Sequence, residues 1–325
     1  MQRLKHILLI CVLAAFFACE KSKDEGEEVS GGNINEISIV ISDVLWNGEV
    51  GDMLRRRFAA PVDGLTQEEP LFTLNQLQDM SFEGSLKKRR NIIVVEKGQK
   101  KGYNFTRNNY CKKQNVFTIT GKSLDDLLEV IDMHADEIIR TIRETEIAEN
   151  QERHVKAGLL DEAKFRERFG VSVKVPSTYG YAIENENFIW LKKDIPGGNT
   201  NLLLYRVPCE VIERDKTPML NIIKMRDSIG NMYIHGQEPG TFMVTEESYS
   251  PYIFMTSFND RPAFETRGNW EMANDYMNGP FLNYAIRDEK TNTFLVIEGF
   301  IYSPSSPKRD LIIELESIIK SLTFL

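Results

Sequence analysis

Cysteine and histidine are both scarce in this chain, which contains four of each among 325 residues. Cys111 and Cys209 are the cysteines that lie beyond the first twenty positions, and neither belongs to a CxxC or CxxH pair. A disulfide framework and a zinc site are therefore excluded, whereas one bridge between these two residues and two separate buried thiols remain open. The chain also lacks GxSxG, HExxH, GxGxxG and DxDxDG sequences, so we expect no metal, no cofactor and no catalytic residue of these classes.

Long apolar runs are absent as well, and the most apolar stretch lies at the start of the chain. Residues 7–17 are eleven apolar residues that follow Arg3 and Lys5 and precede Ala18. A membrane-spanning helix needs about 20 apolar residues, so this segment is too short to cross a bilayer. A basic start, a short apolar stretch and a small residue are typical of a cleaved secretion signal, which we predict over residues 1–18.

A cysteine follows directly after the predicted signal. Cys19, preceded by a small residue, resembles the bacterial lipoprotein box, in which the thiol carries acyl chains such as palmitate and anchors the protein to a membrane. The alternative is a plain secreted protein in which Cys19 is incidental. Residues 19–35 are rich in charge and glycine, which predicts a flexible acidic tether. We therefore expect an outer-membrane lipoprotein on the periplasmic or the surface-exposed side.

The three residues Lys23, Asp24 and Glu25 resemble the acidic export signal that sends lipoproteins of Bacteroidetes-type bacteria to the cell surface. A solvated run of charges is the alternative interpretation. Beyond the tether the composition is ordinary, with 42% hydrophobic and 27% charged residues, which excludes wholesale disorder and a multi-span membrane protein. Because domains are typically about 150 residues long, the length predicts two of them.

Positive charge is concentrated in one segment of a chain whose formal net charge is −8. Residues 87–113 contain ten lysine and arginine residues and one acid, Glu96, with Tyr103, Phe105 and Tyr110 among them. Such a segment suits anionic lipid or anionic glycan, whereas we expect no nucleic-acid partner outside the cell. The alternative is a solvated hairpin whose lysines protect a strand edge. The residues proposed to meet an anionic partner are Lys87, Lys88, Arg89, Arg90, Lys100 and Lys101.

The order of apolar patterns predicts an α+β protein with two domains of mostly antiparallel sheet and packed amphipathic helices. We place the N-terminal domain at residues 36–149, a helical connector at 150–170 and the C-terminal domain at 171–325. Each half ends with an apolar strand, a serine-capped loop and an amphipathic helix, which suggests a duplicated unit.

Two helices have clear signals in the sequence. Apolar residues at spacings of three and four predict a helix over 124–142, with Ser123 and Asp126 as its capping box. His134 lies on the apolar face of this helix, and we interpret it as a core imidazole rather than a catalytic group. The last helix is expected to use Ser306 as its cap and Pro307 as its first residue.

A set of aromatic residues in the second half is the strongest candidate for a binding site. Their rings would stack on the faces of sugars while neighbouring asparagine amides bond the hydroxyl groups. The alternative is that these rings fill the core of the domain. The candidate ligand-binding residues are Arg267, Trp270, Tyr276, Phe281 and Tyr284, with Tyr302 as a further ring.

A hydrolase that acts on cell-envelope glycan or a related polymer is the second functional hypothesis. It would use carboxylates such as Glu265 or Asp275 beside Trp270. Glycoside hydrolysis of this kind needs two carboxyl groups about 5–10 Å apart in a cleft. No catalytic motif supports it, so a non-enzyme is favoured.

Several stretches carry a family resemblance. They are IVISDVLWNGEV and FAAPVD in the first half and ETRGNW, MNGPF and EGFIYSPSSPKRD in the second. Together they resemble the uncharacterised Bacteroidetes lipoproteins of domain-of-unknown-function family 4837, over nearly all of the chain after the signal. The family has no established activity, so the resemblance implies no catalytic residues.

Two further stretches, KVPSTYGY and IIKSLTF, look like the fold shared by Mog1 and photosystem PsbP proteins. Those proteins are mostly non-enzymatic partners of other molecules. Together the sequence features favour an envelope-anchored lipoprotein with a non-catalytic role in binding or assembly at the outer membrane. An envelope protein is a further candidate partner, besides anionic lipid or glycan.

Overall fold

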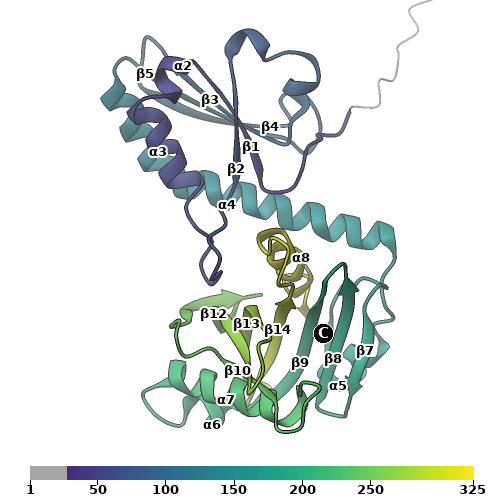
Figure 1. The fold of residues 1–325 in the computed structure, drawn as a ribbon. Helices are drawn as coiled ribbons and strands as arrows, with labels where there is room; N and C mark the ends of the chain where they lie inside the picture. Colours follow the sequence, from purple (N-terminus) through teal and green to yellow (C-terminus); the bar gives the residue numbers. More distant parts are fainter. Residues whose placement is uncertain (1–27) are drawn as a thin grey trace, which may run out of the picture.

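The computed structural model describes residues 28–325, which form two domains with one long helix between them (Figure 1). The predicted signal, the predicted anchor Cys19 and the predicted tether up to residue 27 lie outside the described residues. The rest of the tether is tied to the first domain. Ser30 N–H donates a 2.9 Å hydrogen bond to Lys112 O, and Arg90 N–H donates a 3.1 Å bond to Gly31 O. Residues 28–35 therefore differ from the freely flexible segment that their composition predicts.

The first domain contains a five-stranded sheet in the order β2-β1-β3-β5-β4. β1, β2, β3 and β5 run parallel to one another, and β4 is antiparallel to β5. The strands are β1 (Glu36–Ile41), β2 (Thr73–Leu77), β3 (Asn91–Lys97), β4 (Gly102–Arg107) and β5 (Asn115–Gly121). The helices are α2 (Asp43–Trp46), α3 (Glu49–Phe58) and α4 (Leu124–Ala157), with two short 3-10 helices, η1 (Asp79–Ser81) and η2 (Gly84–Lys88).

The mostly parallel arrangement corrects the prediction of an antiparallel sheet for this half. β1 reads EISIVI and is buried at five of its six positions. One face of the sheet packs against α3 and α4, and Leu77 and Phe82 pack on the other face. Strands that are buried on both faces read as continuous apolar runs, which is typical of parallel sheets and gives no alternation to interpret.

The helix α4 has 34 residues, and its N-terminus has the predicted capping box, in which the Ser123 hydroxyl accepts a hydrogen bond from Asp126 N–H. It extends to Ala157, so the predicted connector begins as a continuation of this helix and ends with α5 (Ala163–Phe169). Figure 1 shows α4 running between the two domains. Its buried stripe is apolar at first and then becomes polar, at Glu146, Asn150 and His154.

The second domain contains an eight-stranded sheet in the order β10-β12-β13-β14-β9-β8-β7, with β11 also paired to β12. All of its strand pairs are antiparallel, as the sequence predicts for this half. The strands are β7 (Gly180–Glu184), β8 (Phe188–Ile195), β9 (Gly198–Pro208), β10 (Phe242–Thr245), β11 (Tyr252–Phe258), β12 (Arg261–Ala273), β13 (Asn278–Asp288) and β14 (Thr293–Tyr302). The helices are α6 (Cys209–Glu213), α7 (Pro218–Tyr233) and α8 (Arg309–Ile319), and β6 (Val171–Ser172) pairs with β15 (Thr323–Phe324).

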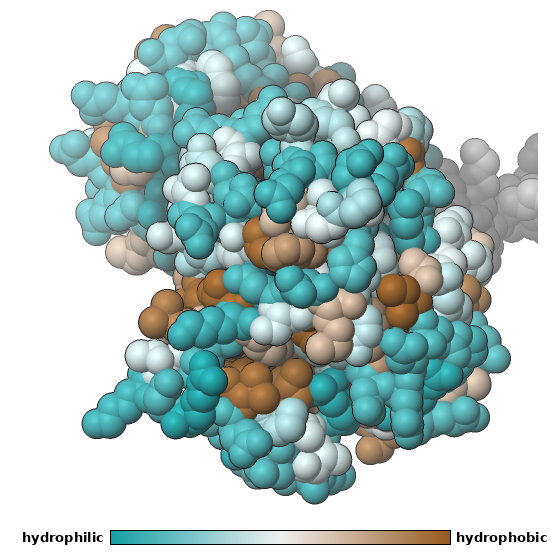
Figure 2. Space-filling view, turned by 60° about the horizontal axis from the view of Figure 1, so that its bottom comes forward, coloured by the Kyte–Doolittle hydropathy of each residue, from teal (hydrophilic) through white to brown (hydrophobic). Residues whose placement is uncertain are grey.

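Helices pack on both faces of this sheet, α8 on one and α7 on the other. Leu315 and Ile318 of α8 pack with Tyr284 and other residues on one face, which we call the α8 face. Ile222 and Met225 of α7 pack on the opposite face, the α7 face. Figure 2 brings the α7 end of the domain forward and shows hydrophobic patches among mostly hydrophilic residues. Exposed apolar residues on α7 are Met219, Leu220 and Met232.

The two domains meet where α4 crosses α8. Arg143 Nη2 on α4 is 2.5 Å from Glu316 Oε2 on α8. Gln151 Nε2, two turns further along α4, donates a 2.9 Å hydrogen bond to Ser317 O. Both contacts join side chains of the first domain to the buried side of α8, so the helix belongs to the interface as well as to the second core.

The N-terminus of α8 is capped across this interface. The Glu69 carboxylate accepts hydrogen bonds from the backbone N–H groups of Lys308 and Arg309, at 2.6 and 2.9 Å. The prediction that Ser306 caps this helix is therefore wrong, because a carboxylate from the first domain satisfies N–H groups that have no partner within the helix.

The α+β class is confirmed, with mostly antiparallel sheet in the second half. The two halves are not copies of one unit, because a five-stranded, mostly parallel sheet differs from an eight-stranded antiparallel one in strand order and direction. The pattern that suggested duplication, a strand followed by an amphipathic helix, is common to many α+β domains.

Candidate functional site

A pocket of about 640 Å³ opens at one end of the α7 face in the second domain. Its floor is the sheet, and the segment that follows α7, residues 234–238, forms its rim. The lining combines aromatic rings with amide and charged side chains: Trp190, Trp270, Phe300 and Tyr302 together with Lys192, Asn199, Asn201, His235, Gln237, Glu238 and Asp275. We call this cavity the aromatic pocket.

Strand register brings the four rings together. Tyr302 and Phe300 lie two positions apart on β14, and Asn201 on β9 pairs with Phe300. The ring centroids of Trp270 and Phe300 are 5.5 Å apart, and those of Trp190 and Phe300 are 6.3 Å apart. Trp270 and Phe300 are almost fully buried, so they form the floor, whereas Trp190 and Tyr302 are partly exposed and form walls.

Both indole rings are held in place by their own N–H groups. Trp190 Nε1 donates a 2.9 Å hydrogen bond to Asn201 Oδ1, and Trp270 Nε1 donates a 3.0 Å bond to Ile301 O. Asn201 in turn donates a 2.7 Å bond to Asn199 Oδ1. Because the N–H groups are satisfied internally, the rings offer apolar surface to the cavity in fixed orientations, and a ligand pays little ordering entropy at them.

The position of Trp270 depends on Gly279, its partner on β13. A Cβ atom at Gly279 would lie 3.2 Å from Trp270 Nε1 and 2.0 Å from Ile301 O. The absence of a side chain therefore lets the indole ring lie directly beside the β13 backbone, within hydrogen-bond distance of β14.

The five predicted ligand-binding residues do not form one site. Trp270 and Phe281 are on the α7 face, whereas Arg267 and Tyr284 are on the α8 face, because their positions along β12 and β13 alternate. Tyr276 lies in the turn between these strands and is 99% exposed. Of the five, Trp270 lines the aromatic pocket, together with the further ring Tyr302.

Phe281 is a core residue with a specific partner. The Arg226 guanidinium lies 3.7 Å from the centroid of the Phe281 ring and hydrogen-bonds both oxygens of Glu298. Arg226 and Glu298 are buried, at 1% and 0% exposure. Asn283 Nδ2 also donates a hydrogen bond to Glu298 Oε2, and Arg226 Nη1 donates one to Thr245 Oγ1. The site of Phe281 is therefore structural.

Arg267 and Tyr284 belong to a chain of charged groups at the domain interface. Arg267 Nε is 2.6 Å from Glu265 Oε1, and Arg267 Nη2 is 3.1 Å from Glu316 Oε1. Tyr284 OH donates a 2.7 Å hydrogen bond to Glu265 Oε2. The chain ends at Arg143 on α4, which bonds the other oxygen of Glu316.

Glu316 of this interface chain is not suited to act as an acid catalyst. Burial acts to raise the pKa of Glu316, but the neighbouring Arg267 and Arg143 lower that pKa to about 2. Glu316 is therefore ionised at neutral pH, whereas glycoside hydrolysis needs a carboxyl group that stays protonated. Glu265 is also separated from Trp270 by the sheet, so the carboxylates named for a hydrolase do not share a site. Of the two carboxylates named for a hydrolase, Glu265 and Asp275, only Asp275 lines the aromatic pocket.

The basic segment, residues 87–113, is partly neutralised. Arg90 is buried and lies near Glu146 and Glu149 of α4, at 3.6 and 3.7 Å. Lys88 pairs with Glu28, and Lys101 pairs with Glu129. Within residues 28–325, the members of the predicted anionic-partner set that form no ion pair are Lys87, Arg89 and Lys100.

The remaining reactive side chains have structural positions. Cys111 and Cys209 are free and buried, each in its own domain, so the bridge between the halves does not form. His134 is 25% exposed and stacks on Tyr103 at 3.8 Å, which corrects its assignment to the core. In the part of the chain that the structure describes, no three histidine, cysteine or acidic side chains are grouped to hold a metal. Among the described helices, none combines the length and apolarity needed to cross a bilayer.

Sequence reasoning missed Trp190, Phe300 and the two asparagines of β9. Trp190 is one of only three tryptophans in the chain, and Lys192 follows it at the spacing of two that places both on one face of a strand. That signal was available in the sequence. The order of strands in the sheet was not, and it is this order that places β8 and β9 beside β14.

Comparison with known proteins gives family matches in both halves. Residues 30–155 match a Domain of unknown function (DUF8532), and residues 159–321 match a second one, DUF4837. No curated protein matches the chain. Solved structures with some likeness include the Ran-binding protein Mog1p of Saccharomyces cerevisiae, at 8% identity and a TM-score of 0.32 over 47% of this chain and 89% of that one. A STAR-related lipid transfer protein from Xanthomonas axonopodis has 8% identity and a TM-score of 0.24, over 45% of this chain and 96% of that one.

The match to DUF4837 extends over the eight-stranded sheet, the aromatic pocket and α8. It covers half of the chain, residues 159–321, and the chain belongs to this family.

Proposed function

We propose that this protein is a non-catalytic carbohydrate-binding lipoprotein of the outer membrane. The aromatic pocket is the observation that supports the proposal. Sugars have apolar C–H faces, which pack on aromatic rings, and hydroxyl groups, which need several hydrogen-bond partners. Four rings held beside Asn199, His235 and Gln237 offer both kinds of contact in one cavity.

The polar part of the pocket favours binding over hydrolysis. Asp275 Oδ1 accepts a 2.6 Å hydrogen bond from Tyr276 N–H, and its turn also carries the Met272–Asp275 backbone bond. Glu238 lies on the rim among exposed residues. The two carboxylates belong to different loops, and Asp275 is engaged in stabilising the turn between β12 and β13.

Removing a wall of the pocket tests the proposal. We expect Trp190→Ala and Tyr302→Ala each to weaken saccharide binding by about tenfold or more, because each variant deletes a stacking surface. Isothermal titration of the mature protein with N-acetylglucosamine oligomers and with methyl hexopyranosides measures the loss. Tyr276→Ala is the matched control, since that ring is fully exposed outside the pocket, and its affinity should stay unchanged. Equal losses in all three variants would refute the assignment.

The membrane anchor is a separate part of the proposal and rests on the lipoprotein box at Cys19. Each buried methylene of an acyl chain contributes about 0.8 kcal/mol, so several chains hold a protein to a bilayer firmly. We expect Cys19→Ser to move the protein from the membrane fraction to the soluble fraction, while Cys111→Ser leaves it in the membrane. Mass spectrometry of the mature N-terminus provides the second readout. An unmodified Cys19 thiol in wild-type protein that is soluble without detergent would contradict the anchor.

A further inference from the structure

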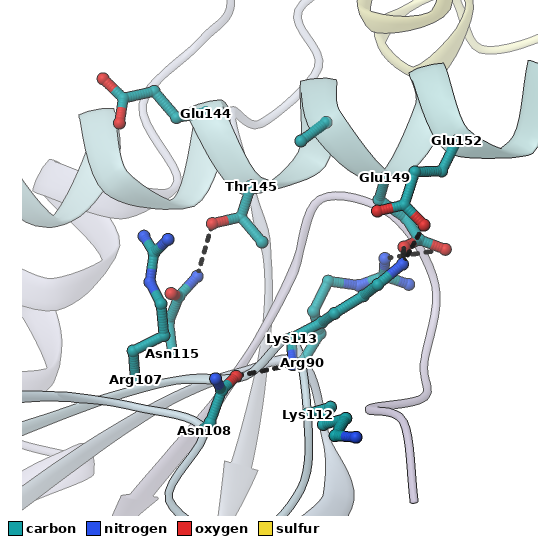
Figure 3. Close-up of a pocket in the computed structure, with 11 residues that line it drawn as sticks. Arg90, Arg107, Asn108, Lys112, Lys113, Asn115, Glu144, Thr145, Glu149 and Glu152 are labelled. Atoms are coloured by element: carbon teal, nitrogen blue, oxygen red, sulfur yellow. Dashed lines mark hydrogen bonds and ion pairs between the residues drawn. The ribbon is translucent and has the colours of Figure 1, made fainter.

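A second cavity, of about 470 Å³, lies in the first domain between α4 and the end of the β4–β5 hairpin (Figure 3). It is formed by residues of the first domain and lies beside the five-stranded sheet, whereas the aromatic pocket lies on the eight-stranded sheet. We call it the hairpin pocket. All of its lining residues except Ala148 are polar or charged, and the stems of their long side chains form part of its surface: Arg90, Arg107, Asn108, Lys112, Lys113, Asn115, Glu144, Thr145, Ala148, Glu149 and Glu152.

The two walls of the hairpin pocket carry opposite charge. Every acidic residue in the lining belongs to α4, whereas every basic residue belongs to the strand side, before β3 or around the β4–β5 hairpin. Figure 3 shows Glu144, Glu149 and Glu152 on the helix, with Arg90, Arg107, Lys112 and Lys113 on the strand side and Lys113 reaching toward Glu149 and Glu152. A cavity with this separation has an electric field directed from the hairpin to the helix.

The floor of the pocket is a buried polar network. Asn115 Nδ2 donates hydrogen bonds to Asn91 Oδ1 and Thr145 Oγ1, at 2.9 and 3.0 Å, and Asn91 Nδ2 donates one of 2.7 Å to Glu146 Oε1. Arg90 is only 4% exposed. Within the described residues its buried Nε has no hydrogen-bond partner, and neither has Glu146 Oε2. Both atoms are closed off from the cavity, and Arg90 Nε lies 3.6 Å from Glu146 Oε1, so the two side chains hold a fixed pair of opposite charges beneath the pocket.

One end of the pocket is closed by internal ion pairs and the other is not. Lys113 crosses from the hairpin to pair with Glu149 and Glu152. Glu144 lies about 8–12 Å back along α4 from these two residues, as the helical rise gives. At that end Arg107 pairs in the sheet with Asn115, whose side chain bonds Thr145. Within residues 28–325, neither Arg107 nor Glu144 forms an ion pair.

We propose that the hairpin pocket binds a small zwitterion, with the oxyanion of the ligand beside Arg107 and the Arg90–Asn115 floor and its ammonium group beside the α4 carboxylates. A zwitterion aligns with the field of the cavity and gains from both walls. A simple anion is attracted by the basic hairpin residues but repelled by Glu144 and Glu149. A simple cation is attracted by these carboxylates but repelled by the basic residues. The shared chemistry is an ammonium group and an oxyanion within one small molecule, as in an amino acid or a phosphoethanolamine headgroup.

Titration with matched small molecules tests this site in the full mature protein. L-alanine and glycerophosphoethanolamine are the zwitterionic probes, and propionate and ethylammonium are the single-charge analogues, all at one ionic strength. We expect at least one zwitterion to bind about tenfold or more tightly than both analogues. NMR or calorimetry measures the binding. The stronger of the two zwitterions identifies the source, a free amino acid or a lipid headgroup. Binding of propionate or ethylammonium as tightly as the zwitterions, or no zwitterion binding up to about 10 mM, would overturn the proposal.

Side-chain variants locate the binding. Arg107→Gln and Glu144→Gln each remove one charged contact, and we expect each to weaken zwitterion binding by about tenfold. Both residues are exposed, so the fold should be retained, and circular dichroism checks it. Lys100→Gln and Glu167→Gln are matched controls, since both are exposed residues of the same charge outside the pocket lining. Losses of the same size in the controls would show a long-range charge effect and refute the site.

Discussion

Glu298→Ala is expected to lower the free energy of unfolding by about 3–5 kcal/mol, because it leaves Arg226 buried without its counter-charge. The Arg226 guanidinium bonds both Glu298 oxygens at 3.0 and 3.1 Å, and both residues are at most 1% exposed. Asn283 Nδ2 also loses its 2.8 Å acceptor. Urea denaturation followed by far-UV circular dichroism measures the change.

Two further variants separate the charge effect from the loss of volume. The double replacement of Arg226 by Met and Glu298 by Leu should recover most of the stability, since it removes both charges and keeps an apolar volume. Glu213→Ala breaks the Arg287–Glu213 pair, whose side chains are 27% and 39% exposed, and should change stability by less than about 1 kcal/mol. A loss below about 1 kcal/mol for Glu298→Ala would mean that this network is not a main support of the second domain.

Gly279→Ala should both destabilise the second domain and abolish saccharide binding. The new Cβ atom would meet Ile301 O at 2.0 Å, so β13 must move away from β14, and such overpacking costs about 1–3 kcal/mol. The same movement displaces Trp270 from the floor of the aromatic pocket, since the Cβ atom would also lie 3.2 Å from its Nε1. Thermal unfolding and isothermal titration together measure the two effects.

Gly180→Ala is the matched control for this substitution. Gly180 is also a strand glycine, but nothing lies within 4 Å of an added Cβ atom there. Its stability should change by less than about 0.5 kcal/mol and its saccharide affinity should be unchanged. If Gly279→Ala behaves like this control, the close approach of β13 and β14 does not set the position of Trp270.

Local features of the fold were readable in the sequence, and long-range ones were not. Ser123 and Asp126 are three positions apart, so the capping box of α4 could be predicted from neighbouring residues alone. The cap of α8 comes from Glu69, which is 239 positions from Lys308, and nothing in the local sequence indicates it. The parallel direction of β1, β3 and β5 escaped prediction for a related reason, because strands buried on both faces lose their alternating pattern.

The aromatic character of the candidate site could be predicted from the sequence, but the set of residues that form it could not. Trp270 and Tyr302 were identified from the density of aromatic residues, and both line the aromatic pocket. Phe281 and Tyr284 were assigned to the same site, yet their spacing of three along β13 places them on opposite faces of the sheet. Trp190 lies on β8, about 80 residues before Trp270 in the sequence. It is brought to the pocket by the order of strands in the sheet, which the sequence does not show.

Tryptophan fluorescence during a saccharide titration tests the central claim most directly. The chain contains three tryptophans, and Trp190 and Trp270 line the aromatic pocket whereas Trp46 lies on α2 of the first domain. We expect N-acetylglucosamine oligomers or methyl hexopyranosides to change the emission saturably, with the change retained in Trp46→Phe and reduced in Trp190→Phe, where Trp270 is the one reporter left in the pocket. An emission spectrum that no saccharide alters, or a change that depends on Trp46 instead, would contradict carbohydrate binding at this pocket.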